Sequence, residues 1–195
     1  MLTLAAGQTI TTKDFEHDDS VRADINKLFH SHLNVGLHGI PTRAEEDSTA
    51  AMVPGFPEEI IVSARHSDRL VGALLMNVAT TRYAQMVSQL GSPDAALLHA
   101  TRWRTLNRMV VIPEFRGQGI GTQMLERAKL MAKLSGARGF DGFAEDSPTP
   151  SWPFYARNGC HVMGEGDPLP PLGGVQMHMP PGVNREGRYF WSRIG

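Results

Sequence analysis

Apolar and polar positions alternate along this chain in patterns that predict both strands and helices. Residues 9–15 begin with β-branched side chains in a short alternation, which is typical of a strand. Ser20 can cap a helix, and apolar residues recur at helical spacing over residues 21–33, so we expect an amphipathic helix there. Residues 38–57 are poorly periodic, and we expect a second short helix with loops in that segment.

Two runs rich in β-branched and apolar residues follow, over residues 59–64 and 70–78. A short polar stretch separates them, which predicts an antiparallel hairpin. We expect a helical insertion next, at about residues 79–104. Within it, Gly91 interrupts one helical pattern and Ser92 can cap a second, so the insertion should contain two short helices.

The rest of the chain returns to a succession of strands and helices. We expect strands over residues 105–112, 140–144, 175–179 and 188–194, and helices over residues 122–134 and 151–158. Hairpins combined with a strand–helix–strand unit predict a mixed sheet, and hence an α/β (α+β) fold class. A chain of 195 residues has the length of one domain, so we expect residues 1–195 to form a single domain.

Charge and composition narrow the expected partners. Nineteen Lys and Arg residues oppose twenty Asp and Glu residues, so a nucleic acid is not the expected partner. The single cysteine cannot form an internal disulfide, and the N-terminal residues lack the basic start of a signal peptide. No apolar run is long enough to cross a membrane. We therefore expect a cytoplasmic protein with no membrane partner and, since no Cys/His/Asp set has zinc spacing, no metal site.

Residues 111–122 are the segment that most clearly indicates a ligand-binding site. They join an expected strand to an expected helix and contain three alternate glycines, Gly117, Gly119 and Gly121. Without Cβ atoms, backbone N–H groups can close on a ligand, and the positive end of the next helix points to the same place. Arg116 adds a positive charge with fork-shaped donors. The spacing differs from Walker and Rossmann loops, and we expect an anion site suited to a pyrophosphate.

Residues 111–121 read Val-Ile-Pro-Glu-Phe-Arg-Gly-Gln-Gly-Ile-Gly, and residues 154–159 read Phe-Tyr-Ala-Arg-Asn-Gly. Together these segments resemble motifs of the GNAT superfamily of acyl-CoA-dependent N-acetyltransferases. Arg116, Gly119 and Gly121 match the family's R/Q-x-x-G-x-G/A pyrophosphate motif. The second segment matches its Phe-Tyr-x-x-x-Gly helix. The order of the expected elements also agrees with the family along most of the chain.

The resemblance implies a GNAT-like mixed β-sheet that is flanked by helices and splays after the strand at residues 105–112. Acetyl-CoA would be the co-substrate, with its pantetheine arm in the splay and its pyrophosphate on the glycine loop. The implied cofactor contacts are Met109, Val110 and Val111 for pantetheine, and Arg116, Gly117, Gln118, Gly119, Ile120, Gly121 and Thr122 for the pyrophosphate. Pro148 departs from the family, which often has an asparagine there in contact with pantetheine.

The insertion at residues 79–104 is longer than the connection that is usual in the family. We expect it either to cover the acceptor end of the cleft or to form a dimer contact. Homodimers are common in such folds, so the resemblance leaves a homodimer possible.

Acetyl transfer to an amine requires a base and benefits from an acid. A lysine-type amine has a pKa near 10.4, so only about one molecule in 2,500 is neutral at pH 7. Tyr155 occupies the position of the tyrosine that relatives often use as general acid toward the leaving thiolate. Where relatives place a base, this chain offers Thr105 and Asn107, which are not competent bases near neutral pH. Glu145 and Asp146 are the base candidates instead, either one acting through a water.

These observations favour an N-acetyltransferase that moves acetyl from acetyl-CoA to a primary amine, by direct attack in a ternary complex. A small-molecule acceptor is the first expectation. Two other interpretations stay open: a non-catalytic acyl-CoA sensor or partner-binding module on the same fold, and acetylation of protein N-termini or lysines. The missing base on the strand favours the sensor, whereas an open groove beside Tyr155 would favour a protein acceptor.

Overall fold

A computed structural model describes residues 2–3, 8–12, 19–33, 59–78, 80–146, 149–164, 167, 169–172, 175–177 and 187–195. The chain divides into two compact units. The first comprises residues 1–76 and 107–131, and the second comprises residues 77–106 and 132–195. Three elements have residues in both units: β4 (Arg69–Val78), β5 (Trp103–Val111) and α5 (Ile120–Leu134). That residues 1–195 form a single domain stays a prediction.

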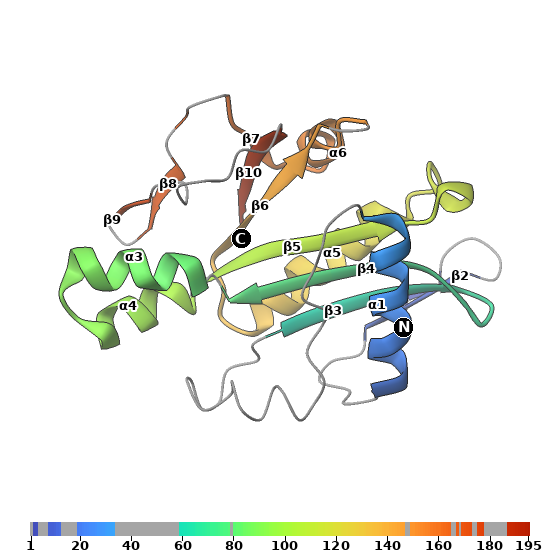
Figure 1. The fold of residues 1–195 in the computed structure, drawn as a ribbon, viewed down its shortest axis with the longest axis horizontal. Helices are drawn as coiled ribbons and strands as arrows, with labels where there is room; N and C mark the ends of the chain where they lie inside the picture. The colour runs from blue at the N-terminus through green and yellow to red at the C-terminus, as the bar shows by residue number, and fades with distance from the viewer. Residues whose placement is uncertain are drawn as a thin grey trace. The chain divides into compact units, whose positions relative to one another are not determined.

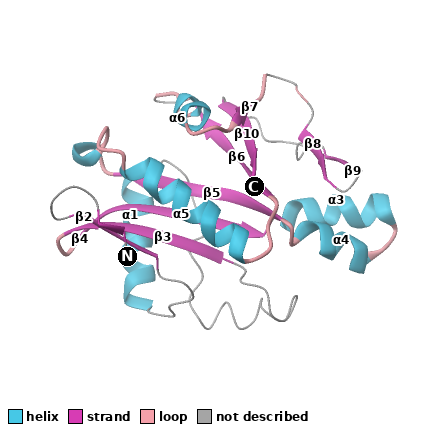
Figure 2. Ribbon diagram, turned by 180° about the vertical axis from the view of Figure 1, so that it is seen from behind, coloured by secondary structure: helices cyan, strands magenta, loops and turns pink. Residues whose placement is uncertain are grey.

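The first unit holds a sheet with strand order β1-β2-β3-β4-β5 (Figure 1). Its other elements are β1 (Leu2–Thr3), β2 (Gln8–Thr12), α1 (Asp19–His32), β3 (Glu59–His66) and the 3-10 helix η2 (Pro113–Phe115). β2 pairs with both β1 and β3 in antiparallel fashion. Helices α1 and α5 cover opposite faces of this sheet, as the front view of Figure 1 and the rear view of Figure 2 both show.

The apolar side of α1 forms one part of the core of the first unit. Ile25 and Phe29 are both buried and lie about one helical turn apart. They pack with Ala73 and Leu75 of β4 and with Val110 of β5. This is the helix face that the spacing of apolar residues predicted.

On the other face of the sheet, Gly72 allows α5 to lie close to β4. A Cβ atom at Gly72 would be 3.1 Å from Met124 Cε and 3.1 Å from the Val110 carbonyl oxygen, which is tighter than ordinary van der Waals contact. Met124 itself is completely buried. The missing side chain therefore sets how closely the helix approaches the sheet, and with it the position of the start of α5.

The second unit holds a sheet with strand order β5-β6-β10-β7 and a separate strand pair, β8-β9. Its other elements are α3 (Thr80–Leu90), α4 (Pro93–Ala100), β6 (Gly139–Glu145), α6 (Trp152–Arg157), β7 (His161–Val162), β8 (Leu169–Leu172), β9 (Val175–Met177) and β10 (Gly187–Arg193). β5 and β6 are parallel, whereas β10 is antiparallel to β6 and β7. These ladders confirm the predicted mixed sheet and the α/β (α+β) class.

The helical insertion forms as predicted, as α3 and α4. Gly91 has a φ of +63°, a left-handed conformation that glycine adopts without strain, and it follows directly on the last residue of α3. The Ser92 hydroxyl accepts a hydrogen bond from the Ala95 N–H (3.3 Å), and Pro93 is the first residue of α4. Cap, proline and glycine thus act as the sequence indicated.

The insertion packs against the C-terminal part of the second unit. Met86 of α3 and Ala96 of α4 are completely buried, and they form a core cluster with Met163. Tyr189 and Trp191, two residues apart on β10, pack against that cluster. The apolar sides of the two helices therefore have partners within the unit. Whether the insertion also covers an acceptor or forms a dimer contact stays a prediction.

Several boundaries differ from the prediction. Ser20 is inside α1, which begins at Asp19, so it is not the predicted cap. α5 begins at Ile120 rather than at residue 122, and β5 at Trp103 rather than at residue 105. The predicted helix at residues 38–57 lies outside the described residues. In the described ranges, no helix is both long enough and apolar enough to cross a membrane.

Three short strands, β1, β7 and β8, were not predicted. β1 and β7 are only two residues long, and β8 contains a Pro-Pro pair that normally argues against a strand. The β8-β9 pair also has an irregular register between Leu169 and Leu172. Local sequence signals of this length and composition are too weak to indicate pairing.

Met86→Ala should lower the free energy of unfolding by about 2–5 kcal/mol, because it removes a completely buried side chain and leaves a cavity. Leu98→Ala is the matched control. Leu98 is 53% exposed on α4, so its truncation should change the unfolding free energy by less than about 0.5 kcal/mol. Urea denaturation measures both. Equal effects of the two substitutions would contradict the packing of the insertion described above.

Candidate active site

The segment that leaves β5 has the geometry of an anion-binding loop. The Ile112 N–H donates to the Val71 carbonyl oxygen (3.0 Å), which holds the end of β5 to β4. After the single turn of η2, Gly117 and Gly119 take φ values of +76° and +78°. These left-handed conformations strain any residue with a side chain, so glycine is required at both positions. The residue after Gly119 is Ile120, the first of α5.

The start of α5 and Arg116 together make this loop electropositive. The first N–H groups of a helix lack partners four residues earlier, and they carry the positive end of the helix dipole. A Cβ atom at Gly117 would have nothing within 4 Å, so the space beside the loop is open. The Arg116 Nε donates to the Val111 carbonyl oxygen (2.9 Å), which fixes an exposed guanidinium at the end of β5. Such an arrangement can bind a pyrophosphate through backbone and guanidinium donors.

The main chain of β5 presents alternate residues to its two neighbouring strands. The Val110 carbonyl oxygen lies 3.1 Å from the Cβ position of Gly72, so it faces β4. By alternation, the main-chain groups of Met109 and Val111 point to the opposite edge. The registered pairs with β6 run from Trp103–Gly139 to Leu106–Gly142, and β5 continues beyond them to Val111. Among the three residues expected to contact pantetheine, Met109 and Val111 therefore have the suitable direction.

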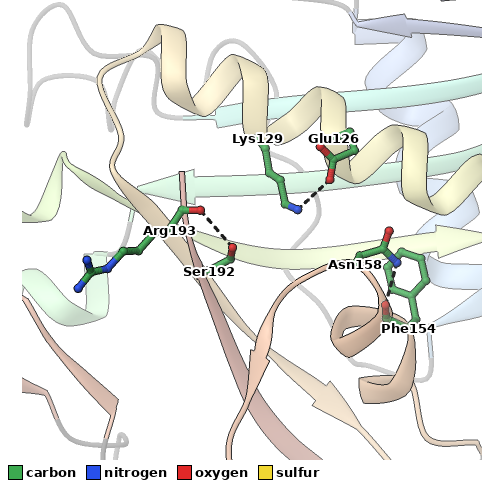
Figure 3. Close-up of polar contacts among 6 residues, drawn as sticks. All are labelled: Glu126, Lys129, Phe154, Asn158, Ser192 and Arg193. Carbon is green, nitrogen blue, oxygen red and sulfur yellow. Dashed lines mark hydrogen bonds and ion pairs between the residues drawn. The ribbon is translucent and has the colours of Figure 1, made fainter. Parts of the chain in front are cut away.

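Tyr155 lies on α6, in the second unit. Its ring stacks on Phe190 of β10, with ring centres 3.7 Å apart and planes 11° from parallel. The last turn of α6 is closed by Asn158, whose Nδ2 donates to the Phe154 carbonyl oxygen at 2.8 Å (Figure 3). Gly159 then turns the chain away with a φ of +75°. Stacking and a well-formed cap therefore hold Tyr155 in one position.

Burial decides the acid strength of Tyr155. The residue is 7% exposed, and burial, with a smaller contribution from the neighbouring Cys160, raises the pKa of the Tyr155 phenol above its ordinary value of 10. Within the part of the chain that the structure describes, its hydroxyl has no hydrogen-bond partner. Tyr155 is thus a protonated donor at neutral pH.

Glu145 and Asp146, the two base candidates, differ in their surroundings. Glu145 is the last residue of β6, and its carbonyl oxygen accepts from the backbone N–H of Ser151 (3.2 Å). In Asp146, the buried Oδ1 atom has no hydrogen-bond partner among the described residues. An unpartnered carboxylate oxygen is costly to bury, so a water or a ligand polar group is the natural partner for Asp146. Pro148 lies outside the described residues.

The sequence did not indicate one polar site, a buried aspartate of β6 that is hydrogen-bonded to the start of β5. Asp141 is 3% exposed and accepts hydrogen bonds from Trp103 Nε1 (2.5 Å) and Thr105 Oγ1 (3.2 Å). Thr105, which was expected on the face where relatives place a base, is therefore a donor to Asp141. The signal was a lone carboxylate inside the apolar strand at residues 140–144.

The Trp103 ring lies over Gly139 at the start of β6. A Cβ atom at Gly139 would be 2.3 Å from Trp103 Cζ3, closer than any real contact, so the indole occupies the space of a side chain. Its Nε1 can then donate to Asp141. Among the residues placed by the structure, no group of three His, Cys, Asp or Glu side chains could hold a metal ion.

Comparison with known proteins adds a family and a fold. A sequence profile described as "Acetyltransferase (GNAT) domain" matches residues 57–159, which is more than half of the chain. No match is found among curated proteins. The matched range contains both the glycine loop and the helix that carries Tyr155.

Three solved structures illustrate the similarity in fold. The aminoglycoside 6'-N-acetyltransferase from Enterococcus faecium is 17% identical with a TM-score of 0.59, over 96% of this chain and 97% of that chain. yncA from Salmonella typhimurium, solved with its cofactor acetyl-CoA, is 13% identical with a TM-score of 0.59, over 97% and 95%. The ribosomal-protein-S18-alanine N-acetyltransferase from Escherichia coli is 12% identical with a TM-score of 0.53, over 96% and 94%. At these identities the likeness establishes the fold.

The phenol of Tyr155 should stay protonated at pH values where exposed tyrosines ionise. Because its pKa is raised in the folded state, the stability it contributes is complete below pH 10 and is lost as the pH rises further. Near-ultraviolet titration of phenolate absorbance should show one tyrosine that ionises only above pH 10, and Tyr155→Phe should remove that step. Tyr83→Phe, which removes a partly buried tyrosine of α3, should leave the step in place. If Tyr155→Phe removed an ordinary step at pH 10 instead, the buried environment would be wrong.

Proposed function

Because this chain belongs to the GNAT acetyltransferase family, we propose that it transfers acetyl from acetyl-CoA to a primary amine by direct attack in a ternary complex. The observation that carries the proposal is the loop before α5, where two left-handed glycines and Arg116 surround the start of a long helix. The family uses acetyl-CoA, and solved neighbours contain acetyl-CoA or coenzyme A. A non-catalytic sensor on the same fold has no comparable support.

In the proposed complex, the cofactor pyrophosphate binds the backbone N–H groups of residues 117–122 together with the Arg116 guanidinium. A diphosphate carries negative charge that matches the helix dipole and the fork-shaped donors of arginine. The pantetheine arm hydrogen-bonds with main-chain groups of Met109 and Val111, which point away from β4. The Val110 carbonyl oxygen faces β4, so Val110 is not proposed to bind pantetheine through that carbonyl. It keeps Met109 and Val111 in position along the strand.

Tyr155 is proposed as the general acid. The thiol of the departing CoA has a pKa near 8.5, whereas the Tyr155 phenol has a pKa above 10, so complete proton transfer to the free thiolate is uphill. The phenol therefore acts chiefly as a hydrogen-bond donor that becomes stronger as negative charge develops on sulfur. The lack of another hydrogen-bond partner among the described residues supports this role.

The amine must lose a proton before or during attack. Freeing a lysine-type amine at pH 7 costs about 4.6 kcal/mol, so a base or a desolvated site has to offset that cost. Of the two base candidates, Asp146 is supported better than Glu145, because one of its carboxylate oxygens is buried without a partner among the described residues. We propose that Asp146 accepts the proton through a bridging water.

The acceptor is proposed to be a small molecule that carries a primary amine. Among the similar structures, one enzyme is an aminoglycoside 6'-N-acetyltransferase and another is a ribosomal-protein-S18-alanine N-acetyltransferase, so the fold itself accommodates both kinds of acceptor. Screening amines and N-terminal peptides by thiol release from acetyl-CoA separates the two. A cytoplasmic location and a homodimer stay predictions.

Gly119→Trp should abolish acetyl-CoA binding, because an indole on the loop would cover the proposed pyrophosphate site. Gly136→Trp is the matched control: Gly136 also has a positive φ, +82°, and open space around it, but it follows the far end of α5. Both variants carry the same kind of backbone strain, so both should lose stability. Only the first should lose cofactor affinity in calorimetric titration. Retained binding by Gly119→Trp would refute the loop assignment.

Tyr155→Phe should lower kcat by about 100-fold or more while the Kd for acetyl-CoA changes little, because it removes the hydrogen-bond donor to the developing thiolate and keeps the ring that stacks on Phe190. Steady-state kinetics together with calorimetry separate the two effects. Cys160→Ser is the control, since it changes a buried neighbour without removing the phenol. An unchanged kcat would exclude Tyr155 as the acid.

A further inference from the structure

The first unit contains a cavity between α1 and the turn that joins β3 to β4. The cavity is open to solvent and has a volume of about 380 Å³. Its lining includes the basic side chains of Lys27, Arg65 and Arg69, together with His32 and two acidic residues, Asp24 and Asp68. Ile112, which follows the last residue of β5, forms part of its wall. The cavity is therefore built next to the glycine loop, within the same unit.

The β3–β4 turn is packed directly against that loop. The Arg69 guanidinium carbon lies 5.9 Å from the centre of the Phe115 ring, and the His66 ring centre lies 5.2 Å from it. Phe115 is the last residue of η2 and immediately precedes Arg116. Neighbouring Cα atoms are only about 3.8 Å apart, so the Arg69 guanidinium beside the Phe115 ring lies near the glycine loop and near a pyrophosphate bound there.

The cavity lining holds two guanidinium groups, those of Arg65 and Arg69, and two carboxylates, those of Asp24 and Asp68. Lys27 pairs with Asp24 (3.7 Å), whereas Arg65 uses one nitrogen to donate to the backbone carbonyl of Asp68 (2.8 Å). Over the described ranges, neither Arg65 nor Arg69 has an ion pair with a carboxylate. Arg65 is thus fixed in place while most of its donors remain unused. The paired N–H donors of two guanidinium groups at one cavity match the arrangement of phosphate oxygens.

We propose that this cavity binds the 3′-phosphate of the CoA ribose, through Arg69 and Arg65. The inference rests on the proposed function, which places the pyrophosphate of the same molecule on the glycine loop. CoA carries this third phosphate only a few bonds from its pyrophosphate, and a phosphate monoester is dianionic near neutral pH. The loop and the cavity would then divide the three phosphates of one ligand between them.

Calorimetric titration of the whole chain with CoA and with 3′-dephospho-CoA tests this directly. Wild-type protein should bind CoA about tenfold more tightly than 3′-dephospho-CoA, the size of one charge-assisted contact. In Arg69→Gln that ratio should fall toward one, with the affinity for 3′-dephospho-CoA unchanged. Arg193→Gln, which removes an exposed cation from β10, should keep the wild-type ratio. The wild-type ratio should also shrink as salt is added, because exposed charges are screened.

Each other outcome overturns the proposal in a distinct way. An Arg69→Gln variant that keeps the wild-type ratio, or that weakens both ligands equally, would exclude a contact with the 3′-phosphate. An Arg65→Gln variant with the wild-type ratio would remove Arg65 from it. If wild-type protein bound neither ligand, the proposed function itself would fail, and this inference with it.

Discussion

The join between β5 and α5 is the constraint on which the proposed cofactor site depends. The strand is held to β4 by the Ile112–Val71 hydrogen bond, and the chain reverses into the helix through two glycines with positive φ. Gly72 lets the helix approach the sheet, so the first turn of α5 is fixed at the point where the strand ends. The proposed anion site is thus part of a strand–loop–helix join whose backbone donors are already aligned.

The second unit contains the proposed acid. Tyr155 is held by stacking on Phe190, and burial makes its phenol a weaker acid than a free tyrosine. A weak acid held in one place is useful where charge appears only in the transition state, since it does not have to ionise to stabilise that charge. In the proposed role, the position of the phenol matters more than its acidity, and the ring contact with Phe190 both buries and orients it.

Features with a local signal were predictable from the sequence. The hairpin, the capped α4 helix and the glycine loop each follow from residues a few positions apart, such as Ser92 and Gly91. Features that depend on pairing between distant segments were not. The direction of the Val110 carbonyl depends on the register of β5 with β4. The hydrogen bond from Trp103 to Asp141 depends on the parallel pairing of β5 with β6. The sequence therefore sufficed to predict the glycine loop as an anion site. The preference for Asp146 over Glu145 as the proposed base depends on the buried Oδ1 atom of Asp146, which only the structure shows.

The contact of Trp103 with Gly139 links two positions that are far apart in the sequence. The indole fills the space that a side chain at position 139 would need, and its N–H satisfies a buried carboxylate. Any larger residue at 139 would displace the ring, and any smaller residue at 103 would leave a void and remove one of the hydrogen bonds that Asp141 accepts. The two sites are therefore epistatic: a change tolerated at one depends on which residue is present at the other, and their combined effect will not be the sum of the single effects.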